Sequence, residues 1–319
     1  MAGPPNSSQM STHAGEKSTS SQRNDRLLIG ELMDTDTTTE ERKFKLTSEE
    51  RTSWDENGYF IRYDVFGKKE NDFLAQIADD IATGKRPFRA QNIHKNALVR
   101  DGKTTASGTH AMHCIHHINN YSPEFLARTR DPRLTDPVVD LIGPNILGLN
   151  NLYIWKPPKI GLGFPWHQDR WYFNRQYKTN KTVGTWTAID AADLENGCLY
   201  VIPGSHKDGV LDHEDLEGSQ QNEFKSARGA KDEDGVAVEV PPGSVIFFDN
   251  RLLHKSTNNH SGRFRRCSVA HYISADSERL PYKNINHIKP VMWVRGDTYS
   301  EKMEPVYRDA LPIPKEQED

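Results

Sequence analysis

The feature that most constrains the fold of this chain is a change of rhythm at Ile146. From this residue onward, short apolar segments are separated by Pro, Gly and Asn. Many short strands with turn residues between them are typical of a β-sandwich or a barrel. The predicted strands span residues 146–155, 164–169, 182–190, 198–202, 236–240, 244–248 and 267–273.

The region before Ile146 has a helical pattern instead. A cap at Thr47 or Ser48 predicts a helix followed by a short strand. Residues 70–84 (ENDFLAQIADDIATG) carry an apolar stripe at helical spacing, and residues 122–145 predict two more short helices. Helices followed by strands predict a mainly β fold with flanking helices, in which a double-stranded β-helix (jelly-roll) core is braced by the N-terminal helices.

The first residues of the chain differ from the rest in composition. Residues 1–42 are polar and rich in Ser and Thr, so they cannot bury enough apolar surface to become ordered. We therefore predict a disordered polar tail over residues 1–42 and a single domain over residues 43–319.

Charge and hydropathy argue against two classes of partner. A formal net charge of −4 and a pI near 6.4 do not suit a nucleic-acid-binding protein, which usually carries a basic stripe. The mean hydropathy is −0.78, and no apolar run approaches the ~20 residues that a membrane span needs. We expect a small-molecule partner, with no nucleic acid and no membrane span. No feature predicts an oligomeric state.

Cysteine usage and targeting signals bear on location. Cys114, Cys198 and Cys267 are too widely spaced for a disulfide framework or a paired-Cys zinc site. The N-terminus lacks the apolar core of a secretory signal. RLLIGELMD at 26–34 begins like an N-terminal peroxisomal address but lacks its closing His-Leu, and the C-terminal EQED is no peroxisomal signal. We predict a cytoplasmic location and leave the peroxisome open.

Three His-x-Asp pairs occur in the chain, where about one is expected by chance. The pairs that begin at His206 and His213 lie in a long polar stretch, and we expect both to be solvated loop pairs. His167 and Asp169 instead stand among large aromatic residues, so His167 can face a dry cavity. The third pair is therefore the candidate metal site.

A third ligand has to come from another segment. On a strand, residues i and i+2 project from one face, so His167 and Asp169 are expected to point the same way. His254 follows the apolar strand at 244–248. Two histidines and one carboxylate with open positions suit an oxygen-activating non-haem Fe(II) centre. Arg265, eleven residues later, can hold a dicarboxylate cosubstrate with its planar fork.

Several motifs in a fixed order support this interpretation. They are GPNI at 143–146, KPP at 156–158, HQD at 167–169, YF at 172–173, WTAID at 186–190, NGCLYVIPGSHK at 196–207, PGSVIFFDNRLLHKS at 242–256 and FRR at 264–266. With these motifs the chain resembles the phytanoyl-CoA dioxygenase family of Fe(II)- and 2-oxoglutarate-dependent oxygenases. The resemblance covers roughly residues 140–275.

The resemblance implies a role for each matching residue. His167, Asp169 and His254 match the iron ligands, and Arg265 matches the residue that grips the distal carboxylate of 2-oxoglutarate. Ser256 matches a hydroxyl donor to that carboxylate. Further contacts to the cosubstrate are implied for Gln168, Trp186 and Leu152, the last at a position where some relatives carry Met.

The resemblance also implies a reaction. With Fe(II), 2-oxoglutarate and O2, such an enzyme hydroxylates an aliphatic carbon of a small organic substrate, and carboxylated and CoA-linked substrates are included. Halogenases of the family have a small residue in place of Asp169, so the carboxylate favours hydroxylation. Arg170, Trp171 and Tyr172 follow the metal motif and are expected to shape the pocket entrance.

Other interpretations stay open. The chain can be a family member that binds 2-oxoglutarate or metal without turnover, or a metal-free jelly-roll binding module. Trp186 can be ordinary core, Ser256 a turn residue, and Arg263 or Arg266 the cosubstrate arginine. HAMHCIHH at 110–117 suggests a second metal site, but without a supporting carboxylate we favour one of its histidines as a lining of the substrate pocket.

Overall fold

The computed structural model describes residues 42–173, 176–216, 224–280, 291–297 and 306–313. Residues Thr37–Asp319 cluster as one compact unit. The predicted tail lies outside the described residues except for Arg42, so the tail and its boundary stay predictions. Within the described ranges, every helix is too short or too polar to span a bilayer.

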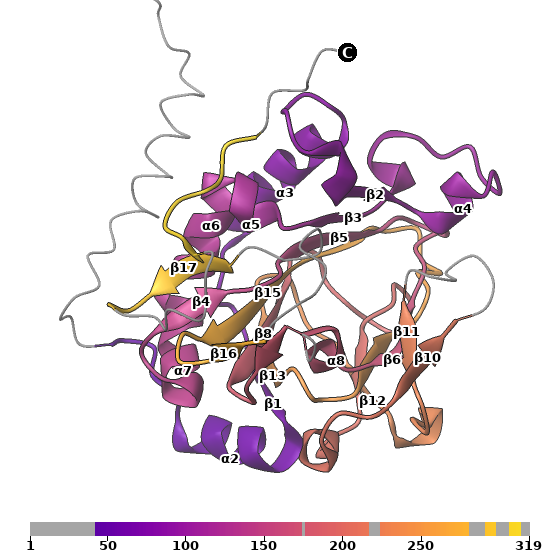
Figure 1. The fold of residues 1–319 in the computed structure, drawn as a ribbon. Helices are drawn as coiled ribbons and strands as arrows, with labels where there is room; N and C mark the ends of the chain where they lie inside the picture. The colour runs from indigo at the N-terminus through magenta and orange to yellow at the C-terminus, as the bar shows by residue number, and fades with distance from the viewer. Residues whose placement is uncertain (1–41, 174–175, 217–223, 281–290, 298–305, 314–319) are drawn as a thin grey trace, which may run out of the picture. The chain divides into compact units, whose positions relative to one another are not determined.

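Two mainly antiparallel sheets form the centre of the fold (Figure 1). The large sheet has the order β1-β13-β8-β15-β4-β17-β18, and β5, β3 and β2 join it through β15. The small sheet has the order β12-β9-β14-β6. The large-sheet strands are β1 (Tyr59–Arg62), β2 (Ile93–Lys95), β3 (Met112–His116), β4 (Ile146–Gly148), β5 (Leu152–Lys156), β8 (Thr182–Ala188), β13 (Val245–Asp249), β15 (Arg265–Ser274), β17 (Val291–Arg295) and β18 (Val306–Tyr307).

The remaining strands are short. Those of the small sheet are β6 (Phe164–His167), β9 (Leu199–Val201), β12 (Val236–Val238) and β14 (His254–Ser256). Two separate two-stranded sheets are formed by β10 (His213–Asp215) with β11 (Lys225–Ala227) and by β7 (Tyr177–Lys178) with β16 (Glu278–Arg279).

Alternation of side chains along the strands separates the interior of the core from its outer face. On β13, Ile246 and Phe248 belong to the cluster that also contains Leu199 and Val201 of the small sheet. Val245 and Phe247 point to the opposite face of β13 and pack into a different cluster, together with residues of the helices. The strands of the large sheet are therefore apolar on both faces, because one face meets the second sheet and the other is covered by helices.

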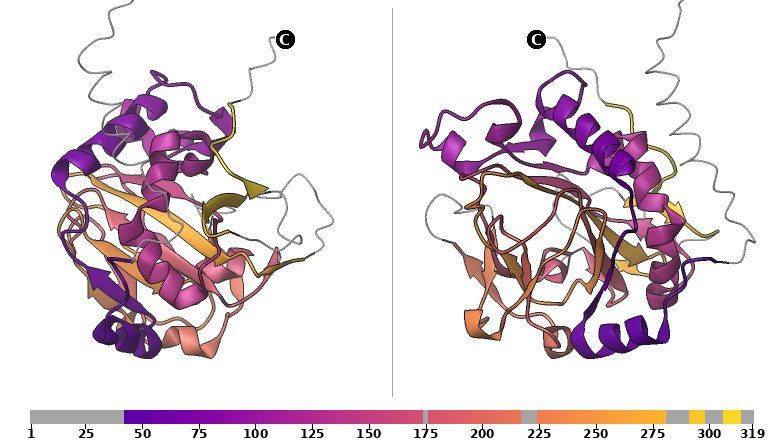
Figure 2. Two further views of the ribbon diagram at one scale, coloured as in Figure 1. Left: turned by 90° about the vertical axis from the view of Figure 1, so that its left-hand side faces the viewer. Right: turned by 180° about the vertical axis from the view of Figure 1, so that it is seen from behind.

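Helices from the N-terminal half cover that outer face. In both views of Figure 2 they lie, in indigo and magenta, outside the orange strands. Leu134, Val138 and Ile142 of α7 pack with Val183 and Val245 of the large sheet. The helices are α2 (Ser48–Asn57), α3 (Lys68–Ala82), α4 (Ala97–Arg100), α5 (Ile118–Tyr121), α6 (Pro123–Arg130), α7 (Pro132–Ile142) and α8 (Asp169–Phe173).

The local helix signals work as predicted. Thr47 caps α2 by accepting a hydrogen bond from the backbone N–H of Glu50, and the Glu50 side chain accepts one from the N–H of Thr47. This capping box satisfies two backbone donors that the first turn of a helix leaves open. The stripe of α3 is buried at Leu74, Ile77 and Ile81.

The strand boundaries needed three corrections. The predicted strand 146–155 is two strands, β4 and β5, because the chain breaks at Leu149–Asn151 and the two pair with different parts of β15. The predicted strand 164–169 ends at His167, and Asp169 begins α8. The prediction also missed nine strands, namely β2, β3, β7, β10, β11, β14, β16, β17 and β18. Most of them have only two or three residues, too few to show a period, and the histidine-rich segment that contains β3 lacks a recognisable alternation of apolar and polar residues.

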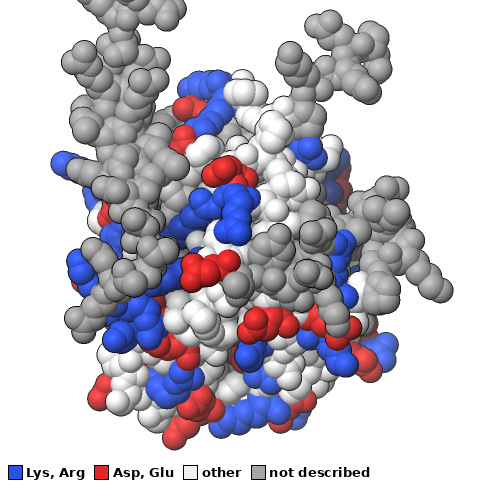
Figure 3. All heavy atoms as spheres, turned by 60° about the vertical axis from the view of Figure 1, so that its left-hand side comes forward, with Lys and Arg blue, Asp and Glu red and all other residues white. Residues whose placement is uncertain are grey.

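Cysteines and surface charges complete the description. Cys114, Cys198 and Cys267 are all free and buried, which confirms that no disulfide framework joins them. On the face drawn in Figure 3, positive and negative side chains are intermixed. Ion pairs such as Arg133–Glu70 tie separate helices together.

Candidate functional site

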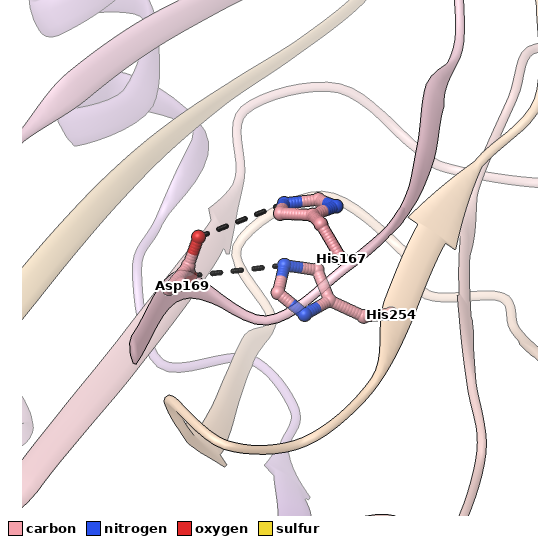
Figure 4. Close-up of side chains that lie close together, drawn as sticks. All are labelled: His167, Asp169 and His254. Carbon is pink, nitrogen blue, oxygen red and sulfur yellow. Dashed lines mark ion pairs between the residues drawn. The ribbon is translucent and has the colours of Figure 1, made fainter. Parts of the chain in front are cut away.

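His167 and His254 lie side by side on neighbouring strands (Figure 4). Strands β6 and β14 pair antiparallel with these two residues in register, and their ring centroids are 4.1 Å apart. The strands approach closely at Gly163, where a β-carbon would lie 2.3 Å from the carbonyl oxygen of Ser256. The glycine ahead of the motif thus lets the first histidine reach the second.

Backbone carbonyls determine the tautomer of both imidazoles. Nδ1 of His167 lies 2.8 Å from the carbonyl oxygen of Pro165, and Nδ1 of His254 lies 3.0 Å from that of Leu252. A carbonyl oxygen only accepts, so each Nδ1 carries the proton and donates it. Each Nε2 keeps a free lone pair, which is the form of histidine that ligates a metal.

Asp169 completes the cluster from the first turn of α8. Its Oδ1 lies 3.6 Å from Nε2 of His167, and its Oδ2 lies 3.7 Å from Nε2 of His254. Both separations are too long for hydrogen bonds. The three ligand atoms lie within 4.8 Å of one another, and no other group of this kind occurs among the described residues. Two neutral imidazoles and one carboxylate fit a divalent transition metal with open positions, as in non-haem Fe(II) oxygenases.

Burial keeps the first histidine neutral. Loss of hydration is the main cause that lowers the pKa of His167 to about 3, and the neighbouring His254 lowers it further. A neutral imidazole needs no deprotonation before it binds a metal.

The loop between the ligands is held by Gln168, which the resemblance assigned to the cosubstrate. Its side chain is fully buried, donates to the carbonyl oxygens of Gly209 and Arg251, and accepts from the N–H of Leu211. It does not line the cavity beside the triad. The structure therefore does not bring Gln168 to the cosubstrate side. Because the backbone turns at this residue, Asp169 reaches His167 from a helix rather than from the predicted strand.

One cavity of about 280 Å³ opens beside the triad. Strand β15 runs along its wall and presents Arg265, Val269 and His271 to it, residues that share one face of the strand. Nδ1 of His271 lies 3.7 Å from Oδ2 of Asp169. The metal ligands thus lie at one end of β15 and Arg265 at the other.

Arg265 is the arginine that faces the cavity. It is 1% exposed, and its guanidinium lies 5.5 Å from the ring centroid of Trp186. Arg266, on the opposite face of β15, donates to both carboxylate oxygens of Asp190. Arg263 is paired with Asp193 at the surface. The alternation expected for a strand is therefore observed.

Three further predicted residues also line this cavity: Leu152, Trp186 and Ser256. Leu152 begins β5, opposite Val269 of β15. Trp186 pairs with the same Val269 from β8. Ser256 is buried two residues after His254 on β14. The structure thus gathers all of the predicted site residues except Gln168 around one cavity.

Sequence analysis missed Lys156, which lies opposite Arg265 in the β5–β15 register. Lys156 is fully buried, and its ammonium donates to Oγ of Ser256 at 2.7 Å. Burial and the nearby Arg265 guanidinium hold the pKa of Lys156 well below its usual value. The sequence does offer one signal for a buried lysine, because Lys156 directly follows the apolar segment LYIW at 152–155.

Three more polar residues line the same cavity. His116 of β3 lines it, in agreement with the expectation that one histidine of the 110–117 segment does so. Asn150 also lines it, and Oδ1 of this buried amide has no hydrogen-bond partner among the described residues. Tyr172 is the third polar residue, and burial raises the pKa of its phenol to about 12, so it stays protonated.

Two of the three predicted entrance residues lie elsewhere. Arg170 is buried, and its guanidinium donates to the carbonyl oxygens of Thr179 and Tyr177. Trp171 stacks on His213 with ring centroids 5.0 Å apart. The short helix α8 turns these residues away from the cavity and leaves Tyr172 inside.

The two rejected histidines are packed rather than solvated, which corrects the prediction. His206 is 5% exposed and lies directly against Gly58. His213 accepts a hydrogen bond from the N–H of Gln168 through its Nε2. Neither belongs to a ligand cluster among the residues that the structure describes. His213 instead supports the loop that carries His167 and Asp169.

Comparison with known proteins agrees with this geometry. The family model described as Phytanoyl-CoA dioxygenase (PhyH) matches residues 54–267, more than half of the 319-residue chain. The chain belongs to the phytanoyl-CoA dioxygenase family. It is therefore a member of a family of Fe(II)- and 2-oxoglutarate-dependent dioxygenases, with a His-Asp-His cluster at the expected place.

Relatives within the phytanoyl-CoA dioxygenase family are of moderate identity. A probable phytanoyl-CoA dioxygenase of Caenorhabditis elegans is 29% identical over 244 residues, covering 72% of this chain and 76% of that protein. The peroxisomal phytanoyl-CoA dioxygenase of Mus musculus is 34% identical over 154 residues, covering 46% of this chain and 45% of that enzyme. The match therefore spans less than half of the mouse enzyme.

Solved structures share the fold of this family member. EctD from S. alaskensis with bound Fe has a TM-score of 0.60 at 23% identity and covers 76% of this chain and 82% of that one. EctD with 2-oxoglutarate and 5-hydroxyectoine has a TM-score of 0.61 at 18% identity, with 86% and 92% covered. This likeness confirms the predicted double-stranded β-helix core.

Proposed function

We propose that this chain hydroxylates an aliphatic carbon of a small organic substrate, with Fe(II) held by His167, Asp169 and His254. One observation supports the proposal above all. The three ligand atoms lie within 4.8 Å of one another on the wall of a cavity whose other end is formed by the buried guanidinium of Arg265. A metal site facing a buried cation across a small cavity suits a chelating dicarboxylate between them.

When bound, Fe(II) and 2-oxoglutarate supply the oxidation, in which O2 and the keto acid yield succinate, carbon dioxide and a hydroxylated product. The chain supplies orientation. Arg265 meets the distal carboxylate with two parallel N–H donors, and Ser256 adds a hydroxyl. Trp186 and Leu152 form apolar walls along the carbon chain of the cosubstrate and exclude water from it.

The substrate occupies the part of the cavity next to His116, Asn150 and Tyr172. Among the described lysines and arginines, only Arg265 and Lys255 line the cavity, and Lys255 is already paired with Asp232. The reacting portion of the substrate is therefore uncharged and largely apolar, with one hydrogen-bond donor that bonds to the unpartnered Oδ1 of Asn150. A CoA-linked substrate fits this description only if its charged part remains outside the 280 Å³ cavity.

The proposal extends to the domain organisation, the kind of partner and the location of the protein. Residues 43–319 act as one catalytic domain on a small molecule, with no nucleic-acid partner. The cytoplasmic location stays a prediction, and the mouse relative is named as a peroxisomal enzyme.

The test is a substrate screen in which succinate formation is measured with anaerobically loaded Fe(II) and 2-oxoglutarate. We expect succinate that depends on Fe(II) and rises with uncharged aliphatic substrates. A protein that binds Fe(II) and 2-oxoglutarate but forms no succinate with any compound is a binder without turnover. A protein that binds no Fe(II) is a metal-free binding module, and either result contradicts the proposal.

A further inference from the structure

We propose that Lys156 is a positioning residue for the cosubstrate: it fixes Ser256 as a hydroxyl donor and adds a second positive charge beside Arg265. The inference rests on the proposed function, because it concerns the end of the cavity assigned to the distal carboxylate of 2-oxoglutarate.

The ammonium of Lys156 is fully occupied as a donor. Nζ donates to Oγ of Ser256 at 2.7 Å, to the carbonyl oxygen of Thr257 and, at 3.4 Å, to that of Gly197. An ammonium has three N–H donors and no acceptor. With three acceptors around it, Lys156 has one fixed orientation, and its bond to Ser256 has only one possible direction.

That direction determines where the Ser256 hydroxyl hydrogen points. A hydroxyl oxygen has two lone pairs and one hydrogen. The lone pairs of Ser256 face Nζ of Lys156 and, at 3.4 Å, the backbone N–H of Phe164. No acceptor for the hydroxyl hydrogen occurs among the described residues, and Ser256 lines the cavity. The hydrogen is therefore left to point into the cavity, toward an incoming acceptor.

Charge at this end of the cavity is unbalanced. Lys156 and Arg265 are 0% and 1% exposed, they pair with each other across β5 and β15, and neither has an ion pair with a carboxylate in the described structure. Nε of Arg265 has no hydrogen-bond partner there either, and its Nη1 donates to Sγ of Cys267 at 3.0 Å. Unpaired buried cations are costly, so they are expected only where an anion binds. Without an anion, burial and Arg265 keep the pKa of Lys156 low, and a bound carboxylate stabilises its charged ammonium form.

A purely structural role is the competing explanation. Lys156 contacts the backbone at Gly197 and Thr257, so it can simply hold these loops against β5. In that case its loss disturbs the whole cavity and weakens every ligand equally. The positioning role instead predicts a loss confined to ligands that carry a distal carboxylate.

The experiment compares two keto acids on the full-length, anaerobically Fe(II)-loaded protein by isothermal titration calorimetry. 2-Oxoglutarate has the distal carboxylate, and 2-oxobutanoate chelates the metal in the same way without it. The variants are Lys156→Met, Lys156→Gln, Ser256→Ala and the double variant Lys156→Met/Ser256→Ala. Lys159→Met is the matched control, because Lys159 lies on the same segment but donates to the carbonyl oxygen of His260 at an exposed position.

We expect Lys156→Met to raise the Kd for 2-oxoglutarate about ten- to hundredfold, as for the loss of a charge-assisted hydrogen bond. The Kd for 2-oxobutanoate should change less than about twofold, because this ligand has no distal carboxylate to interact with Lys156 or Ser256. The double variant should bind 2-oxoglutarate only slightly more weakly than Lys156→Met, because the two side chains act as one unit. Lys159→Met should bind as the wild type does.

Two results overturn the inference: an unchanged Kd for 2-oxoglutarate in Lys156→Met, or equal losses for both keto acids. If Lys156→Met does not fold, Lys156→Gln decides, since it keeps one donor for Ser256 and should lose affinity for 2-oxoglutarate alone. If the wild type binds neither keto acid, the proposed function itself fails, and this outcome is distinct from the other two.

Discussion

Two regions of this molecule are rich in histidine, and only one of them builds a metal site. The segment 110–117 holds four histidines in eight residues, whereas the candidate metal centre takes one histidine from each of two strands. His110 packs against Phe264, His113 stacks on Phe164, and His116 lines the cavity. The histidines that are crowded in sequence therefore point to different surroundings.

The difference shows that a metal site requires ligands that meet at one point in the fold, and that many histidines close together in the sequence are not enough. Neighbouring residues of one strand alternate between its faces, so a single segment such as β3 cannot focus several imidazoles on one point. Paired strands can, because residues in register project side by side, as His167 and His254 do. A carboxylate from a third direction, Asp169, then completes a ligand set with open positions.

The largest effect is expected from removing a metal ligand. His167→Ala or His254→Ala should abolish Fe(II) binding and Fe(II)-dependent succinate formation. This loss is greater than the about 10–100-fold loss of metal affinity that follows when a residue hydrogen-bonded to a ligand is removed. Equilibrium dialysis with Fe(II) checks this. His113→Ala is the control from the other region and should bind Fe(II) fully. Retained Fe(II) binding in either triad variant contradicts the assignment.

The next effect concerns Arg265. Arg265→Lys keeps the charge but loses the planar fork, and a charge-assisted hydrogen bond contributes about 1.5–3 kcal/mol. The apparent KM for 2-oxoglutarate should rise roughly ten- to hundredfold, measured by succinate formation. Arg266→Lys is the matched control, because Arg266 points away from the cavity toward Asp190. If only Arg266→Lys raises the KM for 2-oxoglutarate, Arg266 and not Arg265 binds the cosubstrate.

A smaller effect is expected from the histidine that lines the cavity without ligating. His116→Ala should leave the binding of Fe(II) and 2-oxoglutarate unchanged and raise the KM for the organic substrate by about two- to tenfold, as the loss of one neutral hydrogen bond does. Kinetics with the best compound of the substrate screen measure it. If this variant no longer binds Fe(II), the prediction is wrong and the 110–117 segment contributes to the metal site.

The smallest effect concerns stability rather than activity. Burial lowers the pKa of His113 to about 3, so this group stabilises the fold above its unfolded pKa near 6.5, and the contribution is lost as the pH falls from there toward 3. At pH 5.5 the loss is ~1.4 kcal/mol relative to pH 7.5. In urea titrations of the metal-free protein, His113→Phe should lose less stability than the wild type over this range. An identical pH dependence shows that His113 does not contribute.

Much of this site could be predicted from the sequence. The ligands His167, Asp169 and His254 stand in contiguous motifs, and the parity of residues along one strand separates Arg265 from Arg266. The contacts of Gln168, Lys156 and His213 could not be predicted, because their partners lie 41 to 101 residues away. Only the pairing of strands brings such residues together, and a sequence shows this pairing only indirectly.

The central claim is that one cavity holds Fe(II) and 2-oxoglutarate together. Anaerobic equilibrium dialysis of the wild-type protein with both ligands tests it most directly. The account predicts one Fe(II) and one 2-oxoglutarate per chain, with 2-oxoglutarate retained at least tenfold more weakly when the metal is removed, because the metal and Arg265 each hold one end of it. Tight binding of 2-oxoglutarate that is independent of the metal, or a chain that binds no Fe(II), contradicts the account.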